Sequence, residues 1–283
     1  QMSAVALMDA RSIAASAARG GLLTSAEEFA EAFTAPPAYH FDPAPYQARV
    51  YQGFGKAQEE APLFYGPNIK DWPQRPALEE NILLKVCSKL LDEVTTTDEL
   101  IPSGETSSYR SNPLRLSDFA LSRKDPQYVP RAKAVKAVEL LRRQNPADPQ
   151  VQEVLTGFDP QRTGLGSLVM ALKPGDGSAR EQAASCQRVL GGCANIAQEY
   201  ATKRYRSNVV NWGMLPFIAE DVKDWNIQPG DRLYLPGIRA AVDSGAEEIA
   251  AVLIQNGAEK PVTLKLPGMT REERDIVLAG CLI

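Results

Sequence analysis

A strand-like run leads directly into a glycine turn and a helical pattern in the second half of the chain. Residues 167–172 read SLVMAL, the turn KPGDGSAR follows at 173–180, and helix-forming residues continue over 181–190. Glycines at 175 and 177 allow backbone N–H groups to converge where the helix begins, and a helix N-terminus favours an anion. Strand, glycine turn and helix in succession indicate a layered α/β fold, so this unit constrains the architecture most.

Apolar runs and helical patterns alternate through the rest of this half. The pattern predicts strands at 81–87, 195–197 and 214–218, helices at 151–155, 202–210 and 270–279, and β-rich segments near 231–235, 249–254 and 262–266. Because the later strands follow one another closely, we expect mixed pairing in a central sheet flanked by helices. Pro130 fits the first turn of a further helix. Its basic residues are expected to form a solvated face: Arg131, Lys133, Lys136, Arg142 and Arg143.

The first 80 residues have a different character. A short helical stretch ends at Gly20 and Gly21, and Ser25 with Glu28 predicts a capping box for a helix to about Phe33. Eight prolines then fall between residues 36 and 80, together with many aromatic residues. Proline opposes regular helix and removes sheet donors, so we expect an extended connector that its aromatic side chains pin to a surface.

The composition excludes several classes of protein. The 283 residues carry 31 Lys and Arg against 35 Asp and Glu, a net charge of −4, which argues against a general nucleic-acid or anionic-membrane binder. The single histidine, His40, rules out HExxH sites and zinc sites rich in histidine. The four cysteines form no C-x-x-C pair and are expected to be reduced. No apolar run reaches membrane-spanning length, and we expect a cytoplasmic protein.

The turn after residue 172 has the features of an anion site. Ser178 and Arg180 stand at the start of the helix, beside Gly177. The sequence matches neither the P-loop nor the G-x-G-x-x-G pattern. A second interpretation stays open, in which this is a tight strand-to-helix turn and Ser178 is merely the N-cap of the helix.

These residues resemble a known family. The run GDGSAREQAA (175–184), then LGG (190–192), Asn208 and GMLP (213–216), is similar to the C-terminal swivel domain of the aconitase family. Thr96-Thr97-Asp98, twelve residues before Arg110, resembles that family's T-T-D-H loop and its arginine. YGPNIK (65–70) is similar to the family's connector, and MDARSIAA (8–15) to the end of its cluster-bearing domain.

The resemblance implies reversible dehydration of a hydroxy di- or tricarboxylate at a 4Fe-4S cluster. Ser178 would remove the proton α to a carboxylate, Arg180 and Arg110 would each bind a substrate carboxylate, and the backbone after Gly177 would support the developing charge. Ala179 would line the substrate site, and Asp98 and Asp176 would support it. A helix dipole supplies only about 0.3–1 kcal/mol, against about 1.4 kcal/mol for each pKa unit, so it cannot ionise Ser178 unaided.

The chain departs from the family pattern at three positions. Ala179 replaces the second serine of G-S-S-R, Glu99 follows Asp98 where histidine is usual, and Gln182 replaces the histidine of R-E-H. A divergent hydratase is therefore favoured over a housekeeping aconitase. In the family, the cluster ligands are one cysteine and a distant C-x-x-C pair in upstream domains, which this chain lacks. Cys186 and Cys193 are expected to be packing residues.

The resemblance also implies a division of the chain. Residues 1–35 are expected to be the tail of an upstream cluster-bearing domain, 36–80 a linker, and 81–283 the swivel domain. The expected partners are a small hydroxy carboxylate and the upstream iron–sulfur domains of the same polypeptide, and this segment alone is expected to be inactive. The alternative is a non-catalytic carboxylate-binding or regulatory module. RNA binding, known among relatives in this family, is disfavoured by the net charge.

Overall fold

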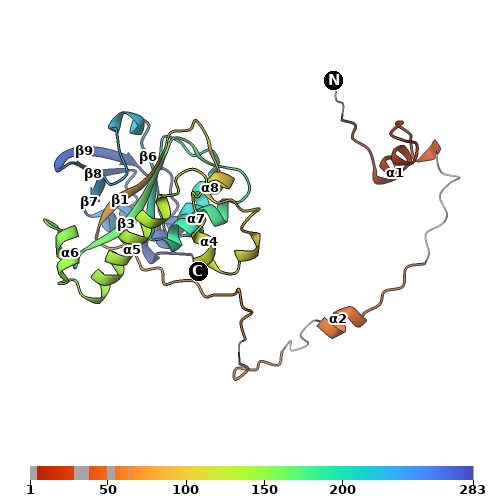
Figure 1. The fold of residues 1–283 in the computed structure, drawn as a ribbon, viewed down its shortest axis with the longest axis horizontal. Coiled ribbons are helices and arrows are strands. Elements are labelled where there is room, and N and C mark those ends of the chain that lie inside the picture. The colour runs from red at the N-terminus through yellow and green to blue at the C-terminus, as the bar shows by residue number, and fades with distance from the viewer. Residues whose placement is uncertain (1–4, 29–37, 50–54, 63, 283) are drawn as a thin grey trace. The chain divides into compact units, whose positions relative to one another are not determined.

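The computed structural model describes residues 5–28, 38–49, 55–62 and 64–282. The chain divides into two compact units, Gln1–Leu63 and Phe64–Ile283 (Figure 1). Each is described by itself. No helix among these residues is both long enough and apolar enough to cross a lipid bilayer.

The first unit contains two short helices. Helix α1 (Ala10–Ala18) begins at Asp9, whose carboxylate accepts hydrogen bonds from the backbone N–H groups of Arg11 and Ser12. The predicted capping box is confirmed, because the Ser25 N–H donates to Glu28 and the Glu28 N–H donates to Ser25. The helix predicted beyond it, to about Phe33, lies outside the described residues. Helix α2 (Ala44–Arg49) shows that the proline-rich connector does contain a helical turn, since a proline in the first turn sacrifices no intrahelical bond.

A closed seven-stranded barrel forms the centre of the second unit. Strands β1 (Asn81–Leu90), β3 (Thr163–Ala171), β5 (Gly192–Ala197) and β6 (Leu215–Ile218) run parallel. Strands β7 (Arg232–Leu235), β8 (Glu248–Gln255) and β9 (Ala258–Lys265) pair antiparallel, with β7 against β1 and β9 against β6. The expected mixed pairing is confirmed. The sequence pattern does not show that the sheet closes on itself.

Strand β1 separates two hydrophobic cores by the alternation of its side chains. Ile82, Leu84 and Val86 point into the barrel and pack with Leu168 and the other interior residues. Leu83 lies on the outer side, in the core beneath the helices. The outer helices are α5 (Tyr128–Gln144), α6 (Pro149–Val154), α7 (Arg180–Val189) and α8 (Lys203–Asn211), with α9 (Ile238–Ser244) and α10 (Arg271–Ala279) packed on each other (Figure 1).

Short elements extend the carboxyl ends of the parallel strands. The two-residue strand β2 (Thr95–Thr96) leads into α3 (Thr97–Leu100), and β4 (Pro174–Asp176) follows β3. A 3₁₀ turn (Ser107–Tyr109) and α4 (Pro113–Ser117) continue the loop after α3, and a further 3₁₀ turn (Val222–Trp225) follows β6. Of these elements, β2 and α3 contact β4, where the glycine turn begins.

The last part of the proline-rich connector belongs to the second unit. The ring of Trp72 packs on Trp212 with centroids 4.5 Å apart, and the Leu78 N–H donates to the Leu278 carbonyl at 3.2 Å. The expectation that aromatic residues pin the connector therefore holds at Trp72.

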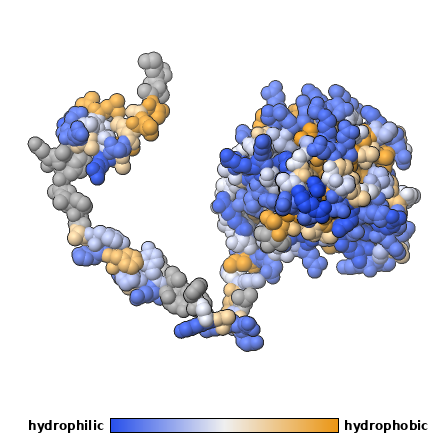
Figure 2. All heavy atoms as spheres, turned by 180° about the vertical axis from the view of Figure 1, so that it is seen from behind, coloured by the Kyte–Doolittle hydropathy of each residue, from blue (hydrophilic) through white to orange (hydrophobic). Residues whose placement is uncertain are grey.

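Helix α5 carries only part of the solvated basic face expected of it, because Lys133 and Arg143 are exposed and the other three cations are not. Arg142 is only 3% exposed and is paired with Glu139 at 2.7 Å and Glu79 at 2.8 Å. Lys136 donates to the Val189 carbonyl and Arg131 donates to the Cys87 carbonyl, each at 2.8 Å. The expectation is wrong for these three cations, because their partners come from segments far away in the sequence. Figure 2 shows that the visible surface of the second unit is otherwise mainly hydrophilic.

Candidate functional site

The glycine turn is attached to a neighbouring loop by a small parallel ladder. Thr95 pairs with Pro174 and Thr96 pairs with Asp176, so β2 and β4 lie side by side. Thr96 also caps α3 through a capping box with Glu99. The two segments that sequence analysis singled out, around Thr96 and around Gly175, are thus neighbours in the fold.

Gly175 rests on a buried tyrosine. It has a φ of +100°, and a Cβ at this position would overlap the ring of Tyr205. The Tyr205 hydroxyl accepts hydrogen bonds from the side-chain amides of Gln187 at 2.9 Å and Asn195 at 3.1 Å. Burial raises the pKa of Tyr205 to about 12, so the phenol stays neutral at physiological pH. Only glycine fits the conformation and the close approach together.

A threonine from the neighbouring loop takes the capping role at the start of α7. The Thr97 hydroxyl accepts a hydrogen bond from the Ala179 N–H at 3.2 Å, and Gly177, with φ +127°, passes directly over that hydroxyl. The N-cap residue of α7 is Ala179, whose small side chain is buried. The interpretation of Ser178 as the N-cap is therefore wrong. The Ser178 side chain is exposed and makes no cap hydrogen bond.

Ser178 and Arg180 line one shallow depression with a volume of about 410 Å³. Three cations surround it, Arg180, Lys203 and Arg204, against the single carboxylate of Glu181. The Arg180 Nε is buried and has no hydrogen-bond partner among the described residues. Ser207 and Asn208 complete the lining. A surplus of positive charge beside two helix N-termini is suited to binding an anion.

Sequence analysis missed Lys203 and Arg204. Both occupy the first turn of α8, directly after its N-cap Thr202. Cations at a helix N-terminus are opposed by the helix dipole, so two in succession are unfavourable unless an anion binds nearby. That unusual placement is a signal that the sequence contains. No ion pair involves either side chain within the part of the chain that the structure describes.

The remaining predicted site residues lie outside this depression. Asp176 is exposed beside the turn. Asp98 pairs with Arg123 at 2.6 Å, and Arg110 is exposed at the end of the 3₁₀ turn Ser107–Tyr109. Of the predicted site residues, Ser178 and Arg180 line the depression. Gly177, Ala179 and Arg110 are not among its lining residues.

The thiols of this chain do not form a ligand set for an iron–sulfur cluster. Cys87, Cys186, Cys193 and Cys281 are unpaired, and no group of three potential metal ligands occurs among the described residues. Burial raises the pKa of Cys87 to about 11 and that of Cys186 further, which disfavours the thiolate that metals bind. Cys186 is a packing residue, as expected.

The chain is similar to known proteins over part of its length. Residues 129–221 match the family model described as the aconitase C-terminal domain. The chain is 28% identical over 172 residues to the mitochondrial aconitate hydratase of Saccharomyces cerevisiae, an alignment that covers 60% of this chain and 20% of that protein. It thus spans about a fifth of the length of this relative. A solved 3-isopropylmalate dehydratase (leuD) from Methanocaldococcus jannaschii is similar with 23% identity, covering 71% of this chain and 90% of that one, at a TM-score of 0.44.

The matched segment contains the structural elements that form the candidate site. It begins in α5 and includes β3, the glycine turn, α7 and α8. The fold and site define an α/β domain with a glycine turn at a helix N-terminus, beside a depression lined by cations. The resemblance to the C-terminal domain of the aconitase family is confirmed over residues 129–221.

Proposed function

We propose that this chain supplies the swivel domain of an aconitase-like hydro-lyase, which dehydrates and rehydrates a citrate- or isocitrate-like hydroxy di- or tricarboxylate. The observation that carries the proposal is the free hydroxyl of Ser178, which lines a cationic depression together with Arg180. A hydroxyl with no structural hydrogen bond is available for proton transfer, and guanidinium groups bind carboxylates in a fixed orientation.

Each residue has a distinct role in the proposed reaction. Ser178 accepts the proton α to a substrate carboxylate, and Arg180 binds that carboxylate. Arg110, on the exposed loop, binds a second one. Of the N–H groups that follow Gly177, that of Ala179 donates to Thr97. The others at the start of α7 are left to face the developing negative charge. Asp98 and Asp176 support the two loops.

The added cations assist Ser178 in this proposal. A serine hydroxyl is a poor base, and the dipole of α7 supplies only about 0.3–1 kcal/mol toward its ionisation. Arg180, Lys203 and Arg204 add three positive charges around the same depression. Each favours an oxyanion at Ser178, most strongly when bound substrate excludes water from the depression.

The rest of the active site is proposed to lie outside this chain. We propose that a 4Fe-4S cluster is held by an upstream domain of the same polypeptide, of which residues 1–35 form the tail and 36–80 the linker to the swivel domain at 81–283. Exposed apolar side chains support this assignment for the tail, since Val5, Leu7, Leu22 and Leu23 are more than half exposed. The cytoplasmic location of the protein stays a prediction from its composition.

The test uses the full-length polypeptide, purified anaerobically. We expect a mass well above twice that of this chain, with iron and acid-labile sulfide present, and turnover of a hydroxy acid. Ser178→Ala should lower kcat by about a hundredfold or more with little change in substrate affinity. Ser207→Ala is the matched control, because Ser207 lines the same depression, and it should retain turnover. Unchanged turnover in Ser178→Ala would remove Ser178 from the mechanism.

A non-catalytic carboxylate-binding module is the second candidate. It is favoured by Ala179, which replaces a hydroxyl that the family pattern has in its substrate site. This candidate predicts that a tricarboxylate binds, that Arg180→Met abolishes the binding, and that no turnover occurs in the cluster-loaded protein. Turnover that depends on Ser178 would exclude it.

A further inference from the structure

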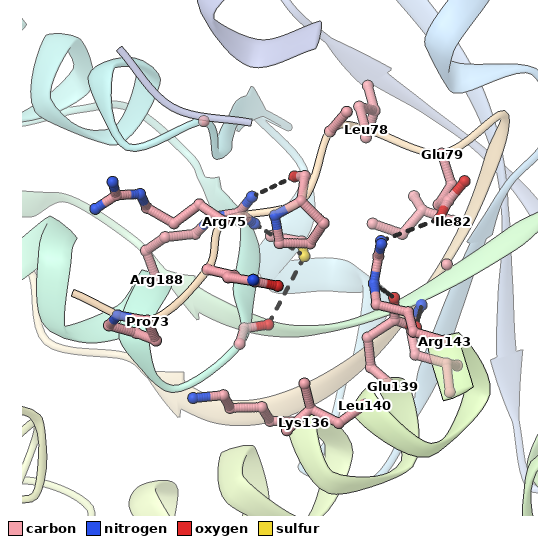
Figure 3. Close-up of a pocket in the computed structure, with 18 of the residues that line it drawn as sticks. Pro73, Arg75, Leu78, Glu79, Ile82, Lys136, Glu139, Leu140, Arg143 and Arg188 are labelled. Carbon is pink, nitrogen blue, oxygen red and sulfur yellow. Dashed lines mark hydrogen bonds and ion pairs between the residues drawn. The ribbon is translucent and has the colours of Figure 1, made fainter. Parts of the chain in front are cut away.

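A second cavity lies at the opposite end of α7 from Ser178. It has a volume of about 440 Å³ and is enclosed between α5 and residues 73–79 of the connector (Figure 3). Its size falls in the range of small-molecule sites, about 300–1,000 Å³. It shares no lining residue with the Ser178 depression. The reaction proposed above does not use it.

Most of the cavity wall is apolar. Leu140 comes from α5, Leu78 and Ile82 from the connector and β1, and Leu165 and Val189 from β3 and the end of α7. Figure 3 shows Leu140 on one wall with Leu78 and Ile82 across the space. Such a wall binds the hydrocarbon part of a ligand, because each buried methylene group leaves water.

The carboxylates in the wall are already neutralised. Glu139 binds Arg142 and Arg143 at 2.7 Å each, and Glu79 binds the same two guanidiniums at 2.8 and 3.0 Å. The Leu165 N–H also donates to Glu139. These groups therefore have little remaining capacity to pair with the other cations of the cavity.

Two cations of the wall have only uncharged partners. Lys136 donates to the Val189 carbonyl at 2.8 Å, and its pKa is lowered by burial and by Lys133. Arg188 donates to the carbonyls of Pro76 and Gly280 at 3.0 and 3.1 Å, and its other bonds also go to uncharged atoms. No carboxylate of the described residues pairs with either one. A bound anion would therefore provide the missing counter-charge.

We propose that this cavity is a binding site for a small amphipathic carboxylate, with its head group at Lys136 and Arg188 and its aliphatic chain along Leu140 and Leu165. The connector forms one wall and α5 the other, so an occupied site fastens the connector to the domain. The site is independent of Ser178 and of the proposed reaction.

The experiment measures binding of three probes to this 283-residue chain by isothermal titration calorimetry. Hexanoate has both the charge and the apolar chain, hexan-1-ol has only the chain, and acetate has only the charge. We expect hexanoate to bind at least tenfold more tightly than either of the others and to raise the melting temperature. Equal binding of hexanoate and hexan-1-ol, or no binding of hexanoate, would overturn the proposal.

Matched variants locate the binding site. Lys136→Met removes the charge and should weaken hexanoate binding at least tenfold, whereas Lys133→Met should leave it unchanged, because Lys133 lies on the same helix, pairs with Asp118 and does not line the cavity. Leu140→Asp changes a half-exposed residue at little cost to folding and should abolish binding by placing a carboxylate in the wall. Ser178→Ala should bind hexanoate normally. Loss of binding in Ser178→Ala, or full binding in Lys136→Met, would place hexanoate elsewhere.

Discussion

The two ends of helix α7 use arginine in opposite ways. At the N-terminal end, the buried Nε of Arg180 has no hydrogen-bond partner in the described part of the chain, and Ser178 lines the same depression. At the C-terminal end, Arg188 donates to carbonyls of the connector, of β5 and of the segment after α10. One end therefore keeps unused hydrogen-bonding capacity beside the depression, whereas the other uses its capacity to join distant segments.

This difference depends on which residue caps the helix. Thr97 comes from another segment and accepts the N–H of Ala179, the N-cap residue, so the first residue of α7 is fixed without a side-chain bond from Ser178. The sequence places a serine where an N-cap is common, and the tertiary structure releases it from that role. The environment of the Ser178 hydroxyl thus depends on Thr97, a residue that is 81 positions away in the chain.

The largest expected effect tests the packing of Gly175 on the ring of Tyr205, at the N-terminal end of α7. Gly175→Ala should lower the free energy of unfolding by about 3 kcal/mol, because a methyl group both opposes the positive φ and overlaps Tyr205. Gly230→Ala is the control, since Gly230 has a φ of +107° and open space around it, and should cost about 1 kcal/mol. Urea unfolding measures both. Equal losses would show that Tyr205 does not restrict the turn.

The second prediction concerns the ion pairs that join α5 to Glu79 of the connector. Arg142→Met should cost about 2–3 kcal/mol in urea unfolding, because it leaves Glu79 and Glu139 with one guanidinium fewer in a largely buried cluster. Arg143→Met removes a more exposed partner of the same carboxylates and should cost less than about 1 kcal/mol. The reverse order would contradict the view that the buried cation holds this cluster together.

The hydrophobic core behind α7 predicts that the protein loses stability at alkaline pH. Burial raises the pKa of Cys87 from 9.0 to about 11, so the folded state keeps a proton that the unfolded state releases. This contribution is fully present below pH 9 and is lost as the pH rises toward 11, at up to about 1.4 kcal/mol per pH unit. Urea titrations across this interval measure the slope. Cys87→Ala should reduce it, and an unaltered slope would exclude this thiol as the cause.

The smallest predicted effect tests the cap itself. Thr97→Val removes the acceptor of the Ala179 N–H and should cost about 1–2 kcal/mol, whereas Thr97→Ser keeps the hydroxyl and should recover most of that loss. Hydrogen exchange of the Ala179 amide gives a local measurement. If Thr97→Val leaves that amide as protected as before, Thr97 is not its cap.

Local patterns predict much of this fold because their causes are local. The strand, turn and helix around Ser178 follow from an apolar run, two glycines and helix-forming residues within 24 positions. The final helix is equally predictable from the sequence, since Thr270 and Glu273 form the capping box at its start. The family resemblance rests on the same local motifs.

Features that depend on distant partners cannot be predicted from local sequence patterns. Closure of the barrel requires β9 to reach β6, and no local pattern reports that pairing. In the sequence, the basic residues of α5 resemble a solvated face. In the fold, Arg142 is paired with Glu79, which lies 63 positions earlier in the chain. Lys203 and Arg204 join the candidate site only because α8 packs beside α7.

The most direct test of the central proposal is exchange of the substrate proton α to the carboxylate. The cluster-loaded full-length protein would be incubated with substrate in heavy water, and incorporation of deuterium followed by NMR. We predict that Ser178→Ala abolishes incorporation while substrate still binds, and that Ser207→Ala exchanges like the wild type. Exchange at the wild-type rate in Ser178→Ala would contradict the assignment of Ser178 as the base.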